Sequence, residues 1–268
     1  MAARDTLRIA AVADLHCTRR SQGMLQSLFA QVAAQADVLL LCGDLVDYGL
    51  PDEAELLTKE LAALKLPILA VLGNHEYESG RVDDVVRILC DAGVTVLDGD
   101  AYEVEGVGFA GVKGFGGGFG RAALQPWGEE TIKRFVHETV EEALKLESAL
   151  AKLRTGQRVA LLHYSPIQTT VEGEPPEIFA FLGSSRLEEP LNRYPVAAVF
   201  HGHAHHGTLE GQTSGGIPVY NVAMPLLRRG FPNQLPVRIL EVPVAPTEAL
   251  QPAGALTAVS TNSSSSSA

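Results

Sequence analysis

The first third of the chain repeats one pattern, in which a short apolar segment is followed by a polar turn and then by a stretch with helical periodicity. The apolar segments are Leu7–Ala13, Val38–Cys42 and Ile68–Leu72. Helices are expected over about 21–35, 51–64 and 81–91. Successive polar turns are about 30 residues apart, which is the length of one βαβ unit, so the pattern predicts parallel strands joined by helices.

The pattern changes after residue 93, where three short strand-like segments follow one another without an intervening helix. They are Val94–Leu97, Tyr102–Val104 and Gly108–Val112, separated by Asp98-Gly99-Asp100 and by Gly106. Turn residues between short apolar segments favour antiparallel pairing. We therefore expect these segments to be antiparallel strands of a second sheet.

Further elements are predicted in the rest of the chain. Apolar residues recur at helical spacing over 129–153, which predicts the clearest helix. Two buried strands are expected at Val159–Leu162 and Val196–Phe200, with a Pro-rich loop over about 165–183 between them. Three more strand candidates lie near 207–210, 217–221 and 236–243.

The segment Gly114–Gly120 contains too many glycines for a regular element. It lacks the context of a phosphate-binding P-loop, because Arg121 follows it and the next helix is expected only at 129. Two interpretations stay open. The segment is either a plain surface turn or a flexible loop beside the functional site, where Phe115, Phe119 and Trp127 could stack on an aromatic group.

Composition adds limits on the class of protein. Hydrophobic residues make up 46% of the 268 residues, which is enough for a core and excludes disorder as the main state. We expect one domain over 1–243 and a disordered tail rich in Ser, Pro and Ala over 244–268. Apolar segments are too short to cross a bilayer, so no membrane partner is expected.

The net charge and the cysteines narrow the partners and the compartment. The formal net charge is −11 and basic residues form no long cluster, which argues against a long nucleic acid as partner. The three cysteines, Cys17, Cys42 and Cys90, have no CxxC spacing and are interpreted as small buried residues. With no signal peptide recognised, a cytoplasmic location is expected.

Potential metal ligands follow five of the predicted strands. In an open α/β sheet, functional groups gather at the carboxyl ends of the strands, so these side chains are expected to meet. Carboxylate, imidazole and amide groups without thiolate suit Mn, Fe, Zn or Ni. The candidates are too many for one tetrahedral ion, which indicates two ions sharing a carboxylate. They are Asp14, His16, Asp44, Asn74, His75, His163, His203 and His205.

These motifs, in order along the chain, resemble the signature of the calcineurin-like metallophosphoesterases. The motifs are Asp14-x-His16, Gly43-Asp44, Gly73-Asn74-His75-Glu76, His163 and Gly202-His203-x-His205. The resemblance covers residues 14–205 and no ligand position is missing. It implies a four-layer αββα sandwich, in which two mixed β-sheets are flanked by helices, and a small bacterial-type phosphodiesterase or phosphatase.

The resemblance also implies a role for each residue. One divalent transition-metal ion is held by Asp14, His16 and His205, the other by Asn74, His163 and His203, and Asp44 bridges both. A hydroxide between the metals would attack phosphorus, and His75 would stabilise the developing charge or protonate the leaving group. His201 and His206 flank the ligands and either orient them or are incidental neighbours.

The expected function is hydrolysis of a small phosphate ester, with a slight preference for a phosphodiester such as a cyclic nucleotide. A phosphomonoesterase of the same family is the first alternative. A non-catalytic scaffold with the same fold and a mononuclear hydrolase of another bond type are further alternatives, and the second of these leaves Asn74, His163 and His203 without a role.

Overall fold

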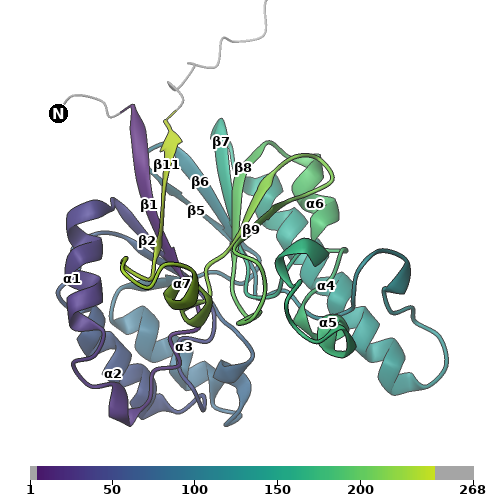
Figure 1. Cartoon of the computed structure of the whole chain (residues 1–268), viewed down its shortest axis with the longest axis horizontal. Helices are drawn as coiled ribbons and strands as arrows, with labels where there is room; N and C mark the ends of the chain where they lie inside the picture. Colours follow the sequence, from purple (N-terminus) through teal and green to yellow (C-terminus); the bar gives the residue numbers. More distant parts are fainter. Residues whose placement is uncertain (1–4, 245–268) are drawn as a thin grey trace, which may run out of the picture.

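The computed structural model describes residues 5–244, whose strands form two sheets (Figure 1). The first sheet contains, in spatial order, β11 (Arg238–Pro243), β1 (Thr6–Val12), β2 (Val38–Cys42), β3 (Ile68–Val71) and β4 (Val94–Val96). The second contains β5 (Asp100–Val104), β6 (Val107–Gly111), β7 (Gln157–Leu161), β8 (Val196–His201), β10 (Pro218–Asn221) and β9 (Glu210–Gln212).

Helices cover the outer face of each sheet, which confirms the expected αββα sandwich (Figure 1). The first sheet is covered by α1 (Gln26–Gln35), α2 (Pro51–Leu61) and α3 (Val82–Asp91), and the second by α4 (Glu130–Lys152) and α6 (Glu188–Arg193). Two further helices are α5 (Phe179–Leu182) and α7 (Met224–Gly230). The 3-10 helices are η1 (Arg19–Ser21), η2 (His75–Tyr77), η3 (Gly120–Ala122), η4 (Gln168–Thr170) and η5 (Pro176–Ile178).

The central strands are buried on both faces, which explains their continuous apolar sequences. In β2, Leu39 and Leu41 pack against the helices of the first layer. The alternate residue Leu40 packs between the two sheets, together with Phe109 of β6 and Phe200 of β8. The layers are therefore held together by apolar packing on each side of every sheet.

The expected antiparallel pairing of Val94–Leu97 in the second sheet is wrong. The structure places β4 in the first sheet, parallel to β3, with Ile68 opposite Val94. The helix α3 returns the chain as the crossover of another βαβ unit, and such a connection places the next strand beside the previous one. Only β5 and β6 form the expected antiparallel pair of the second sheet.

Local boundaries differ from the expected ones where tertiary contacts intervene. Helix α1 begins at Gln26 rather than near residue 21, because the Glu60 side chain of α2 accepts hydrogen bonds from the backbone N–H groups of Gly23 and Leu25. The strand expected at 207–210 is β9, which lies at Glu210–Gln212. Short helices α5 and α6 and the helix α7 were not expected.

Two other predictions are corrected or lie outside the structure. The segment Gly114–Gly120 is not a plain surface turn, because Gly116, Gly117, Gly118 and Phe119 are all buried. Its irregular backbone is held by hydrogen bonds to the α5 region, such as Gly118 N–H to the Gly183 carbonyl at 2.8 Å. The tail predicted over 244–268 lies outside the described residues except for residue 244, so it stays a prediction.

Candidate metal centre

The candidate ligands lie in the turns that follow β1, β2, β3, β7 and β8, and four of them have a left-handed backbone. The φ angles are 57° at Asp14, 43° at His16, 50° at Asp44 and 70° at His203. Residues with a side chain rarely adopt positive φ, and the cost of doing so is usually met at functional sites. The backbone strain therefore coincides with the residues that the sequence marks as ligands.

Glycines next to these residues allow the turns to approach one another. A Cβ at Gly73 would collide with the carboxylate of Asp44, and a Cβ at Gly43 would collide with the ring of His163. Gly73 therefore needs glycine for close approach, and Gly43 needs it both for close approach and for its positive φ of 84°.

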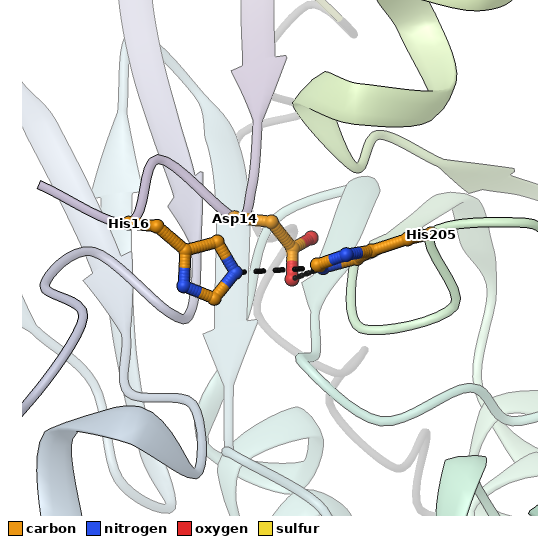
Figure 2. Close-up of side chains that lie close together, drawn as sticks. All are labelled: Asp14, His16 and His205. Carbon is orange, nitrogen blue, oxygen red and sulfur yellow. Dashed lines mark hydrogen bonds and ion pairs between the residues drawn. The ribbon is translucent and has the colours of Figure 1, made fainter.

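Asp14, His16 and His205 form the first group of ligand atoms (Figure 2). The His205 Nε2 atom lies 3.0 Å from Asp14 Oδ1 and 3.5 Å from His16 Nε2. Both oxygens of the buried Asp14 carboxylate also accept the backbone N–H of His203, at 3.1 and 3.0 Å. That contact ties the turn after β1 to the turn after β8.

Asp44, His163 and His203 form a second group. The fully buried His163 places its Nε2 atom 3.4 Å from Asp44 Oδ2 and 3.1 Å from Asn74 Oδ1. The rings of His163 and His203 have centroids 4.8 Å apart. All four predicted ligands on this side are therefore brought together from the ends of β2, β3, β7 and β8.

Asp44 lies between the two groups. Its Oδ2 atom is 3.9 Å from His16 Nε2 on one side and 3.4 Å from His163 Nε2 on the other. His16, Asp44 and His75 also qualify as a group of three ligand atoms. The structure places His75 beside Asp44, at a distance of 3.9 Å from its Nε2 atom to Asp44 Oδ2.

Hydrogen bonds on the far side of each ring fix which nitrogen faces the centre. His163 donates its Nδ1–H to the Cys42 carbonyl at 3.0 Å, and His16 donates its Nδ1–H to Asp47 Oδ1 at 2.9 Å. In both rings Nε2 is then the free ligand atom. His203 has the opposite arrangement, since its Nε2–H is donated to the Phe181 carbonyl at 3.1 Å and Nδ1 remains free.

Burial and close contacts shift the pKa values of several side chains in the candidate metal centre. Burial opposes the charged form of Asp44, but attraction to His163 outweighs it and holds the pKa of the carboxyl well below its usual range. Burial likewise opposes the charged form of His163, yet its partner Asp44 raises the pKa of the imidazole to about 9. Burial lowers the pKa of His203 to about 4.

The donor set fits divalent metal ions. Carboxylate, neutral imidazole and amide oxygen atoms converge, as divalent transition metals require. Without bound metal ions, the protonated imidazole of His163 supplies the positive charge beside Asp44. A buried carboxylate needs such a compensating charge. The residues present therefore fit a metal centre.

We expect metal binding to release a proton. A ligating His163 must be neutral, whereas the metal-free side chain is protonated below about pH 9. Raising the pH removes the competing proton, so the apparent affinity for Mn²⁺ should rise about tenfold per pH unit between pH 6 and 8. Calorimetric titrations in buffers of different ionisation enthalpy would measure the released proton. An affinity independent of pH would contradict this prediction.

Glu76 has a positioning role. It is part of the motif Gly73-Asn74-His75-Glu76, but the sequence alone did not indicate this role. Its buried carboxylate accepts the backbone N–H groups of Leu45 at 2.7 Å, Val46 at 3.1 Å and Gly73 at 2.5 Å. It therefore holds the turn that carries Asp44 against the turn that carries Asn74. The only sequence signal is its place next to His75.

Glu76→Gln should destabilise the fold and loosen the metal centre. The amide keeps one acceptor, but its NH₂ group faces a backbone N–H, so one buried donor loses its partner. Such a loss costs about 1–3 kcal/mol of unfolding free energy. Urea denaturation of the metal-free variant would measure it, with Glu78→Gln on the exposed surface as control. An unchanged midpoint would exclude this role.

The remaining histidines and cysteines lie around the centre or away from it. His201 is buried, donates its Nδ1–H to the Gly202 carbonyl and accepts the Thr170 hydroxyl at Nε2, both at 2.8 Å. It thus supports the turn that carries His203 without belonging to the ligand groups. His137 is exposed on α4, as expected. Cys17 and Cys42 are buried, but Cys90 is exposed, contrary to expectation.

Comparison with known proteins agrees with this geometry. The family model described as calcineurin-like phosphoesterase matches residues 7–207. No curated protein matches the sequence significantly. Within residues 5–244, no helix combines the length and apolar character required of a membrane-spanning segment.

Solved structures share the fold at low sequence identity. Phosphopantetheinyl hydrolase from Mycobacterium tuberculosis is 16% identical, with a TM-score of 0.64, covering 92% of this chain and 98% of its own. A putative 5'-nucleotidase from Staphylococcus aureus is 14% identical (TM-score 0.51), covering 81% and 48%. The anchor in the inner membrane complex of Plasmodium is 12% identical (TM-score 0.50), covering 83% and 73%. At these identities the likeness shows the fold alone.

Proposed function

Because the chain belongs to the calcineurin-like phosphoesterase family, whose members are phosphoric ester hydrolases, we propose that it binds two divalent transition-metal ions and hydrolyses a small phosphodiester. The observation that carries the proposal is the position of Asp44. Its carboxylate lies 3.4 Å from His163 Nε2 and 3.9 Å from His16 Nε2, between two groups of ligand atoms. A shared carboxylate is what a pair of adjacent cations requires.

Each residue of the centre has a distinct task in this proposal. Asp14, His16 and His205 would hold one ion, Asn74, His163 and His203 the other, and Asp44 both. When bound, the ions lower the pKa of water and neutralise charge on the phosphate. His75 keeps its Nδ1–H on the Asp47 carbonyl at 2.5 Å, which leaves Nε2 to act on the substrate.

The class of ester is inferred from charge and size. The net charge of −11 disfavours a long polynucleotide, so the substrate is a small molecule such as a cyclic nucleotide, with a phosphomonoester as the alternative. All three cysteines are free, which fits a reducing cytoplasm. The substrate and location rest on these arguments and not on the fold.

A substrate panel would test the proposal. Aryl phosphodiester, aryl phosphomonoester, cyclic nucleotides and a phosphopantetheinyl ester should each be assayed with Mn, Fe, Zn and Ni, the last ester because one structural neighbour is described as acting on that group. We expect turnover of a diester only with added metal. Less than one bound metal per chain after metal-replete preparation, together with no turnover, would favour a scaffold instead.

A further inference from the structure

Lys113 lies at the carboxyl end of β6, beside the strand ends that carry the candidate ligands. Strand β6 runs parallel to β7. The Lys113 carbonyl accepts the backbone N–H groups of His163 at 2.9 Å and Tyr164 at 3.1 Å. These two bonds fix Lys113 to the turn that carries His163, at the edge of the sheet where function is expected.

The ammonium group of Lys113 is half-buried and has no carboxylate within ion-pair distance in the described part of the chain. Burial lowers the pKa of the amine, and Glu142, Glu138 and Asp98 attract its charge only from farther away. Its Nζ atom donates to the Gly114 carbonyl at 2.9 Å and lies above the rings of Phe115, Tyr164 and Tyr77, with centroid distances of 4.8, 5.3 and 5.7 Å. No carboxylate of residues 5–244 forms an ion pair with it. Buried charges are normally paired, and the aromatic rings offset only part of the cost.

One of these rings, that of Tyr164, also contacts the candidate metal centre. The ring of Tyr164 packs on the ring of His203, with centroids 4.5 Å apart, and on that of His163, with centroids 5.5 Å apart. The ring is buried, yet the Tyr164 hydroxyl has no hydrogen-bond partner in the described part of the chain and still reaches solvent. Unused donors of Lys113 and Tyr164 therefore lie one aromatic ring away from the candidate ligands.

We propose that the ammonium of Lys113 and the hydroxyl of Tyr164 bind a second anionic group of the substrate, a carboxylate or phosphate distinct from the scissile phosphate. Because the ring of Tyr164 lies between the ammonium and His203, an anionic group at Lys113 is separate from a phosphate at the candidate metal centre. In a chain with a net charge of −11, a local cation is needed to attract a substrate with two anionic groups. The proposal rests on the proposed hydrolysis of phosphate esters and names its substrate class.

The test compares esters that differ only in the second charge. One series is 4-nitrophenyl ω-carboxyalkyl phosphates with two to six methylene groups, and the other is 4-nitrophenyl alkyl phosphates of the same lengths. For the manganese-loaded protein we expect kcat/KM to be roughly tenfold higher for the carboxylate at the best length, as for one charge-assisted hydrogen bond. Lys113→Met should bring this ratio close to one, and Lys113→Arg should retain most of it.

A matched control and a binding measurement separate the possible failures. Lys65→Met removes the same charge from an exposed residue that precedes β3 of the first sheet, and it should leave the ratio unchanged. Calorimetry with ω-carboxyalkyl and alkyl phosphates tests binding without turnover. Selective binding without hydrolysis would reject the proposed function but keep the proposed anion-binding site at Lys113. A ratio of one at every length in the wild type, or equal losses for both series in Lys113→Met, would overturn the proposed anion-binding site.

Discussion

Replacing Asp44 with asparagine should remove metal from the centre and lower kcat by a factor on the order of 10³. Two adjacent cations repel each other, and the carboxylate of Asp44 is the negative group between the two sets of ligand atoms. Asparagine keeps the shape but removes the charge. Elemental analysis of the purified variant would measure metal per chain, and initial rates with the best ester of the panel would measure kcat.

The same change should also alter the metal-free protein. Asp44 raises the pKa of the buried His163, so Asp44→Asn should lower that pKa and make the imidazole neutral near pH 7. Asp83→Asn, on the exposed face of α3, is the matched control and should change neither metal content nor rate. Two bound metals with near-normal activity in Asp44→Asn would show that this carboxylate does not bridge them.

His75→Ala should keep both metals and the fold but lower kcat by roughly 10²–10⁴-fold, as expected for the loss of a general acid or a charge stabiliser. His75 is held by its Nδ1 contact with the Asp47 carbonyl, and its Nε2 atom lies 3.9 Å from Asp44 Oδ2. Neither proposed set of metal ligands needs it. Rates, metal content and melting temperature would be compared with those of His137→Ala, which removes an exposed histidine of α4.

A comparison of two leaving groups distinguishes the two possible roles of His75, general acid and charge stabiliser. An alkoxide leaves with a proton, whereas a nitrophenolate leaves without one, so a general acid should matter much more for the alkyl ester. Equal losses for both esters would point to stabilisation of the phosphoryl oxygens. Loss of a metal ion in His75→Ala would instead make His75 a ligand, a role that its grouping with His16 and Asp44 would then explain.

The structure also shows where sequence patterns failed, and each failure has a physical reason. Strand β4 joined the first sheet because a crossover helix, rather than the turn at 98–100, determines its neighbour. Helix α1 begins late because the distant Glu60 binds the backbone before it. Most of the segment Gly114–Gly120 is buried because it packs against the α5 region, which lies about 60 residues further along the chain.

The sequence by itself indicated the βαβ units and the candidate ligands, and its resemblance to a known family implied the layers of the fold. Continuous apolar segments indicate strands buried on both faces, and polar residues at their ends must meet at one edge of each sheet. Only the tertiary structure decided how those side chains are held and what surrounds them. The position of Asp44 between two groups, the support from Glu76 and the unpaired charge of Lys113 each depend on contacts between residues far apart in the chain. Such contacts follow from packing, which hydrophobic periodicity does not encode.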